Sequence, residues 1–147
     1  MDIVKTLRKF AILVLALSGM TSFARAESPN DLLIVVNKSV SASNVDAAEV
    51  KSIFLKDKTS LSSDTVFPLN AKSDSDLRAA FRKHVLKMSE EKEKGFWEDE
   101  KVKKGVEPPP ETAGTLKAVF SKSGGISYVF RKDYKDGTAK IVASFSD

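Results

Sequence analysis

A continuous run of five apolar residues, Leu32–Val36, constrains the fold more than any other feature of this sequence. Its branched side chains are typical of a strand that is buried on both faces. A Ser-rich loop (37–44) follows, and then a segment in which Val50, Ile53 and Phe54 share one face of a helix. Strand, loop and amphipathic helix in this order indicate the start of a βαβ unit, so the sequence predicts an α/β fold.

The next expected strand is VFPL (66–69), and Pro68 argues against a central position because proline has no backbone N–H to donate. In the helix after it, apolar side chains recur every three or four residues and so share one face. Leu77, Ala80, Phe81, Val85 and Met88 form this face together with His84. The helix should pack through this stripe, with Arg78, Arg82 and Lys83 off that face.

Ser89 is placed to cap a charged helix that runs to Lys104. Glutamates open this helix and lysines close it, as the helix dipole favours. Alternating charges are typical of a solvated face, and the other interpretation is an interaction helix. Phe96 and Trp97 interrupt the charges, and we expect them to anchor the helix to the core rather than to form a stacking platform.

A proline-rich connector (105–110) leads to a third expected core helix over residues 111–123. Its apolar face would consist of Leu116, Val119 and Phe120, and two glycines would end it.

The apolar period then changes from 3.6 to 2 in residues 126–130 and 139–145. The Asp136–Gly137 turn signal between these two segments predicts a C-terminal β-hairpin. Taken together, the segments predict a small α/β domain in which helices cover a mixed sheet.

The first 26 residues have the pattern of a cleaved signal peptide. Three basic residues precede an apolar run, Phe10–Leu17, and Ala24-Arg25-Ala26 matches the small-x-small cleavage pattern. A membrane anchor is the other interpretation, but a spanning helix needs about 20 apolar residues. We therefore expect cleavage after Ala26 and a single domain over residues 27–147.

The sequence contains no cysteine. A lipid-modified cysteine, a disulfide framework and a thiolate metal site are therefore excluded. With the predicted cleavage, this absence favours an exported periplasmic protein that is not a lipoprotein and is not inserted in the membrane. Secretion from the cell is the alternative destination.

Charge gives no sign of a nucleic-acid partner. The full chain has 24 Lys and Arg against 20 Asp and Glu, and residues 1–26 hold four of the basic residues and one of the acidic ones. The remaining 20 basic and 19 acidic residues form no electrostatic footprint for nucleic acid.

Few residues point to catalysis. His84 is the only histidine, and its place on an apolar helix face is more typical of a packed residue than of a general base. Asp74 and Asp76 have the chemistry to touch a hard cation, but such pairs are common in capped helix starts. We expect no enzyme activity, no cofactor and no metal site.

Residues 73–76, Ser-Asp-Ser-Asp, open the second expected helix and have two interpretations. In the first, Ser73 or Asp74 caps the helix, and the acidic residues offset its dipole. In the second, the free N–H groups of the helix start bind an oxyanion, with charge from Lys72 and hydroxyls from Ser73 and Ser75. Asp76 opposes an anion in that arrangement.

Four segments, in their order and spacing, resemble the phosphate ABC transporter substrate-binding proteins. The segments are LLIVVNKSVSASNVDAAEVKSIFLKDK, VFPLNAKSDSDLRAAFRKHVL, GFWEDEKVKKGVEPPP and GGISYVF, and they cover nearly all of residues 27–147. The resemblance is to short, single-lobe members and implies one periplasmic-binding-protein type II-like lobe. The sequence departs from the family pattern at Lys56 and Ser127, where the family has glycine. It departs again at Ser75, Asp76 and Leu77, where the family helix start has glycines and a threonine.

This resemblance implies a small oxyanion such as phosphate as ligand. The residues implied as its ligands are Lys72, Ser73, Asp74, Ser75 and, in the Ser-rich loop, Ser39. One lobe leaves a ligand exposed to water, so the expected function is weak oxyanion binding or an accessory role in uptake, beside an ABC permease or another periplasmic or membrane protein. The alternative is a non-enzymatic adaptor that uses the same fold without a ligand.

Overall fold

A four-stranded mixed sheet in the order β4–β7–β1–β8 forms the centre of the protein. The computed structural model describes residues 26–147. β1 (Leu32–Val36) lies between β7 (Gly125–Phe130) and β8 (Lys140–Phe145) and is antiparallel to both. The short strand β4 (Phe67–Pro68) runs parallel to β7 at one edge. Every side chain of β1 is fully buried, which confirms the central strand expected from the apolar run.

This strand order corrects two expectations about pairing. The predicted C-terminal hairpin is wrong, because β1 lies between β7 and β8 and pairs with each of them. The predicted βαβ unit is also wrong, because β4 is parallel to β7 and therefore opposite in direction to β1. Alternation along a segment predicts a strand but carries no information on its partner. A strand with apolar side chains on both sides takes an internal place in the sheet, where both of its faces are covered.

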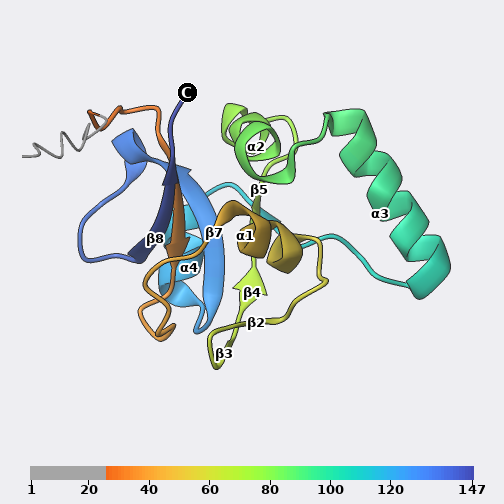
Figure 1. The fold of residues 1–147 in the computed structure, drawn as a ribbon, viewed down its shortest axis with the longest axis horizontal. Coiled ribbons are helices and arrows are strands. Elements are labelled where there is room, and N and C mark those ends of the chain that lie inside the picture. The colour runs from red at the N-terminus through yellow and green to blue at the C-terminus, as the bar shows by residue number, and fades with distance from the viewer. Residues whose placement is uncertain (1–25) are drawn as a thin grey trace, which may run out of the picture.

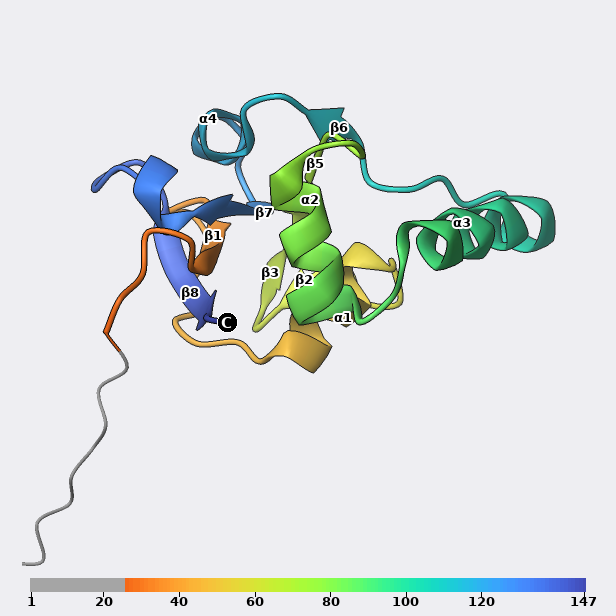
Figure 2. The same ribbon diagram turned by 90° about the horizontal axis from the view of Figure 1, so that it is seen from above.

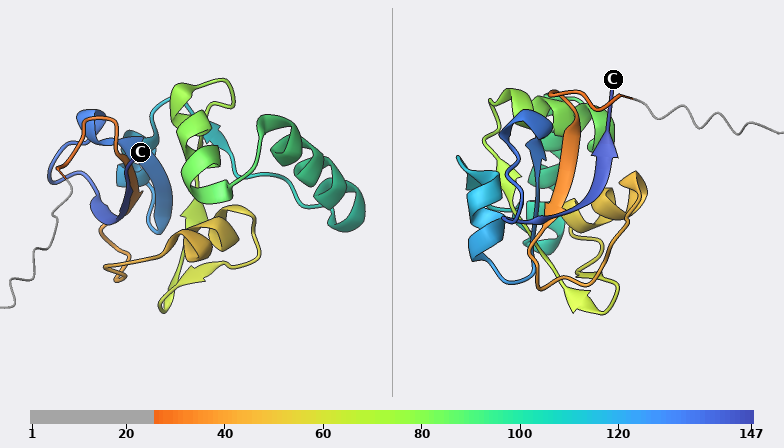
Figure 3. Two further views of the ribbon diagram at one scale, coloured as in Figure 1. Left: turned by 45° about the horizontal axis from the view of Figure 1, so that its top comes forward. Right: turned by 90° about the vertical axis from the view of Figure 1, so that its left-hand side faces the viewer.

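Helices cover both faces of the sheet. α1 (Ala47–Phe54) is capped by Asp46 and buries the three apolar residues expected of it. α2 (Asp76–Phe81) packs on the same side and continues as a π-helical segment, Arg82–Leu86. α4 (Thr115–Ser121) lies on the opposite face, as the right-hand view of Figure 3 shows.

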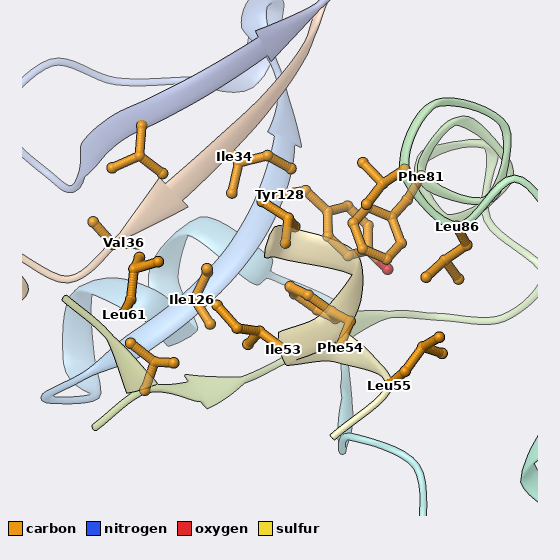
Figure 4. Packing of buried hydrophobic residues seen from close by; sticks show 14 of the residues in the cluster. Ile34, Val36, Ile53, Phe54, Leu55, Leu61, Phe81, Leu86, Ile126 and Tyr128 are labelled. Atoms are coloured by element: carbon orange, nitrogen blue, oxygen red, sulfur yellow. The ribbon is translucent and has the colours of Figure 1, made fainter. Parts of the chain in front are cut away.

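The main core lies between the sheet and the helices α1 and α2 (Figure 4). Tyr128 of β7 stacks on Phe81 with ring centroids 4.0 Å apart, and Phe54 packs against Phe81 at 4.7 Å. A smaller cluster beneath α4 joins Val119 to the other face of the sheet. Phe120 is 57% exposed, so its predicted place in the core is wrong.

Two small sheets complete the strands. β2 (Ser60–Leu61) and β3 (Asp64–Thr65) form a two-residue antiparallel pair. β5 (Asn70–Ala71) runs parallel to β6 (Glu111–Thr112). The sequence predicts the start of the third helix at residues 111–112, which are instead this strand. This second pair brings the start of α2 next to Glu111.

α3 (Glu90–Lys104) projects from the body of the protein (Figures 1 and 2). Ser89 caps it as predicted, through a bond from the Lys92 N–H of 3.1 Å. Trp97 is 8% exposed and Phe96 packs on the main core, which confirms both as anchors. Val102 in the far half is 87% exposed, so only the near half of the helix is held.

The predicted signal peptide lies outside the described residues, apart from Ala26, and its cleavage stays a prediction. Over residues 26–147 no helix has the length and apolar character that a membrane crossing requires.

Candidate functional site

The start of α2 is capped by Ser75. Its Oγ accepts a bond from the Arg78 N–H at 3.1 Å and donates one to the Lys72 carbonyl at 2.6 Å. The Ser75 N–H also donates to the Lys72 carbonyl, at 3.0 Å. The prediction that Ser73 or Asp74 caps the helix is therefore wrong by one or two positions, and the Ser75 hydroxyl is engaged in holding the turn.

The Ser73 backbone N–H binds a carboxylate of the chain itself. It donates to Oε1 of Glu111 at 2.5 Å, which the parallel pairing of β5 with β6 places beside it. Arg82 supports Ser73 from behind, since its Nη2 donates to the Ser73 carbonyl at 3.1 Å and to the Ser73 hydroxyl at 3.0 Å. The Ser73 N–H therefore donates to an anionic oxygen that the chain itself supplies.

Beneath this turn lies a buried cluster of two arginines and one glutamate. Oε1 of Glu93, from α3, accepts from Arg78 Nη2 at 2.9 Å and from Arg82 Nε at 3.1 Å. The three side chains are 5–7% exposed. Arg78 Nη1 also donates to the Ala71 carbonyl at 2.9 Å. Arg78 Nε is the one buried side-chain nitrogen or oxygen without a hydrogen-bond partner in the described part of the chain.

The sequence did not indicate this cluster, because the buried face of the helix is rotated from the predicted one. The buried positions include Arg78, Phe81, Arg82 and Val85, which also follow a spacing of three and four residues. The sequence prediction treats arginine as solvent-facing, and the predicted apolar face of the helix is therefore displaced by one residue from the buried face. Arg78 and Arg82 are four residues apart on the face that also carries Phe81 and Val85, and this spacing was the one feature of the sequence that could have indicated buried arginines. The spacing alone does not identify the acidic residue that pairs with them.

A cavity of about 510 Å³ opens between this cluster, α3 and the prolines 108–110. Trp97 forms part of its wall. Four cationic side chains and five carboxylates line it: Arg78, Arg82, Lys94 and Lys101, and Glu90, Glu93, Glu98, Glu107 and Glu111. In the lining of this cavity, carboxylates therefore outnumber the cationic groups that could bind an anion from solution.

The five predicted ligand residues do not all meet. Lys72, Ser73, Asp74 and Ser75 form one turn, in which Lys72, Ser73 and Asp74 are exposed. Ser39 instead accepts from the Gly124 N–H at 2.9 Å, at the start of β7. The Lys72 turn follows Ala71, whose N–H donates to the Tyr128 hydroxyl farther along β7. In Figure 1 the loop after β1 and the start of α2 lie at opposite ends of the sheet.

His84 has a packed position, as the sequence predicted. Its side chain is 15% exposed, and Nε2 lies 3.2 Å from Oδ1 of Asp147. Its ring stacks near Phe145, with centroids 6.3 Å apart. Among residues 26–147 no three His, Cys, Asp or Glu side chains gather in a way that could hold a metal ion.

The fold is similar to solved phosphate-transport proteins. No protein-family model and no curated protein matches this sequence. The chain is similar in structure to an ABC-type phosphate transport receptor from Vibrio cholerae, with a TM-score of 0.58 and 13% identity. It is also similar to a protein assigned as a phosphate ABC transporter substrate-binding protein, with bound phosphate, from Clostridium perfringens, with a TM-score of 0.55 and 14% identity. A third structure, a possible phosphate binding protein from Planctomyces limnophilus, gives a TM-score of 0.51 at 12% identity.

The three alignments cover 78%, 78% and 79% of this chain but 47%, 45% and 42% of the other three. The chain therefore spans less than half the length of each of these structures. At such identities the likeness concerns the fold alone, and at that level the predicted α/β fold with a mixed sheet covered by helices is confirmed.

Proposed function

We propose that the protein is a non-enzymatic, exported domain that binds a phosphate-like oxyanion weakly at the start of α2, or assists uptake through this site. The observation that carries the proposal is the bond from the Ser73 N–H to the Glu111 carboxylate. A backbone group that holds a carboxylate oxygen also has the charge and direction to hold a phosphate oxygen. The solved structures of similar fold support this ligand class, since one of them contains bound phosphate.

In this proposal an oxyanion takes the place of Glu111. Ser73 donates its N–H to the anion, Lys72 supplies positive charge, and Arg82 holds the Ser73 carbonyl and hydroxyl in position. Ser75 contributes by capping the turn, and the exposed Asp74 opposes the anion. Ser39 has no part in the same contact, because its hydroxyl is bonded to the Gly124 N–H.

Binding at this turn should be weak and should depend on salt. Lys72 and Ser73 are exposed, and exposed charge pairs are worth about 0.2–1 kcal/mol each. Glu111 also competes for the same N–H. We therefore expect a dissociation constant in the millimolar range, where the binding free energy is about −4 kcal/mol.

A phosphate titration followed by ¹H–¹⁵N NMR at low ionic strength tests the proposal. The wild-type amides of residues 72–76 should shift saturably, Glu111→Gln should tighten binding, and Lys72→Ala should weaken it. Glu98→Gln is the matched control, because Glu98 lines the same cavity but does not contact Ser73. Absence of shifts at residues 72–76 in both the wild type and Glu111→Gln at millimolar phosphate would reject the site.

A second function, that of an adaptor, is favoured by the far half of α3. Val102 is 87% exposed on a helix that projects from the domain. Under this proposal the helix contacts a permease or another periplasmic protein. Cross-linking in intact cells should give a covalent adduct with the partner, and Val102→Asp should abolish it. Phe120→Ser, which alters an exposed apolar residue elsewhere, should leave the adduct unchanged. An adduct of equal yield in both variants would show that α3 does not contact the partner.

A further inference from the structure

A second cavity, of about 630 Å³, lies beside the edge strand β4 and contains none of the residues of the Ser73 turn. Its walls are largely apolar, with side chains from the end of α1, from β4 and its neighbours, and from the proline connector. These residues are Ile53, Val66, Phe67, Pro68, Leu69 and Pro110. Ligand pockets in proteins commonly measure about 300–1,000 Å³, so the volume suits a small molecule.

Phe67 is the exposed aromatic side chain of this wall, and it is held in place. Its side chain is 45% exposed, although its backbone N–H donates to the Gly124 carbonyl at 2.9 Å within the sheet. The ring packs directly over the Gly124 backbone, since a Cβ at Gly124 would lie 3.1 Å from the ring and 2.6 Å from the Thr65 carbonyl oxygen. Gly124 therefore makes room for an aromatic surface that faces solvent.

The charge around this cavity has one sign. Three lysines line it, Lys56, Lys58 and Lys122, and no Asp or Glu does. Lys58 pairs with Glu49 at 2.6 Å. Within residues 26–147, Lys56 and Lys122 form no ion pair with a carboxylate, and the Lys122 ammonium lies 4.5 Å from the centroid of the Phe67 ring.

The backbone at Lys56 adds to this pattern. Its φ is 62°, in the left-handed region that favours glycine. A residue with a Cβ atom is sterically disfavoured in that region, yet the position carries a long cation that lines the cavity. Residues held in sparsely populated backbone conformations cluster at ligand sites.

We propose that this cavity binds a single-chain anionic amphiphile, such as an alkyl carboxylate or an alkyl phosphate. The alkyl chain lies against Phe67, Pro68 and Leu69, and the anionic head is held by Lys56 and Lys122. An apolar wall with cations and no carboxylate matches a ligand that is apolar along its length and negative at one end. Inorganic phosphate has no apolar part and therefore does not match this cavity. The cavity shares no residue with the Ser73 turn, so this proposal does not depend on the proposed function.

Sodium decanoate below its micellar concentration is the probe, with octyl glucoside as an uncharged amphiphile for comparison. Decanoate should shift the amides of residues 53–69 and 122–126 saturably, whereas phosphate should leave them unchanged. Lys56→Gln and Lys122→Gln should each weaken decanoate binding about two- to fivefold, as expected for an exposed charge contact, and should not change the response to octyl glucoside.

Matched variants separate the charge from the apolar wall. Lys132→Gln is the control for Lys122→Gln, because Lys132 also lies over an aromatic ring, that of Phe130 at 5.2 Å, but outside the cavity. Phe67→Ser should abolish decanoate binding, whereas Phe120→Ser, which also alters an exposed phenylalanine, should leave it intact.

Vesicles of phosphatidylglycerol distinguish a free amphiphile from a membrane surface. Saturable decanoate binding that is lost in Phe67→Ser and weakened in both lysine variants supports the proposal. Sedimentation with the vesicles and no response to monomeric decanoate would overturn it. Decanoate binding of wild-type strength in the Lys56→Gln, Lys122→Gln double variant would also overturn it.

Discussion

Arg78 of α2 and Glu93 of α3 form an ion pair of 2.9 Å in which the side chains are 5% and 6% exposed. Arg82 shares the same carboxylate oxygen, so two cations depend on one anion. This contact fixes the near half of α3 to the helix that carries the Ser73 turn. Any change at Glu93 therefore acts on the fold first and on the candidate site through it.

Glu93→Gln should destabilise the protein by about 3–5 kcal/mol, because it leaves two buried guanidinium groups without a counter-charge. Urea denaturation measures the loss. Glu98→Gln, on the same helix but exposed, should change stability by less than about 0.5 kcal/mol. Equal effects of the two substitutions would show that the buried pair contributes nothing to the attachment of α3.

Ser75→Ala should cost about 0.5–2 kcal/mol of stability, because it removes the oxygen that accepts from the Arg78 N–H. Asp74→Ala leaves this cap intact and should cost less. Thermal unfolding of the two variants side by side compares the positions. A larger loss for Asp74→Ala would assign the cap to the aspartate.

Export should produce a chain that begins at Glu27, because Ala24-Arg25-Ala26 follows a short apolar run. The intact mass of the protein from the periplasmic fraction measures this directly. A mass that includes Phe10–Leu17 would contradict both the cleavage and the predicted location.

Local pattern predicted most of the elements. Leu32–Val36 is a strand with the expected bounds, Ser89 caps its helix, and Pro68 lies in an edge strand. These features depend on interactions within a few residues, or on how much apolar surface one segment must bury. They can therefore be predicted without knowledge of the rest of the chain.

Pairing between distant segments could not be predicted in the same way. The place of β1 between β7 and β8 depends on which strand has both faces covered, and the alternation of the two C-terminal segments is equally compatible with a hairpin. The bond between Ser73 and Glu111 depends on the β5–β6 pair, which has only two residues in each strand. The buried arginines were missed because their burial depends on Glu93, which lies in a helix with mostly exposed charges.

The Tyr128 hydroxyl accepts from the Ala71 N–H at 3.0 Å and donates to Oδ1 of Asn70 at 3.1 Å. Burial raises the pKa of this phenol from 10.0 to about 12. Tyr128→Phe removes both hydrogen bonds, so at neutral pH it should destabilise the protein by about 1–3 kcal/mol.

The pH dependence of this difference follows from the sign of the shift. Between pH 10 and 12 the unfolded chain loses the phenolic proton while the folded protein retains it, so the contribution of the hydroxyl is complete below pH 10 and falls as pH rises toward 12. A shift of this size corresponds to about 3 kcal/mol. In urea denaturation, the stability advantage of the wild type over Tyr128→Phe should therefore be largest at neutral pH, and it should shrink or reverse above pH 10. Because both proteins contain the same lysines, their titration largely cancels in the comparison. A difference that stays constant from pH 8 to pH 12 would show that the hydroxyl ionises in the folded protein as readily as in the unfolded chain.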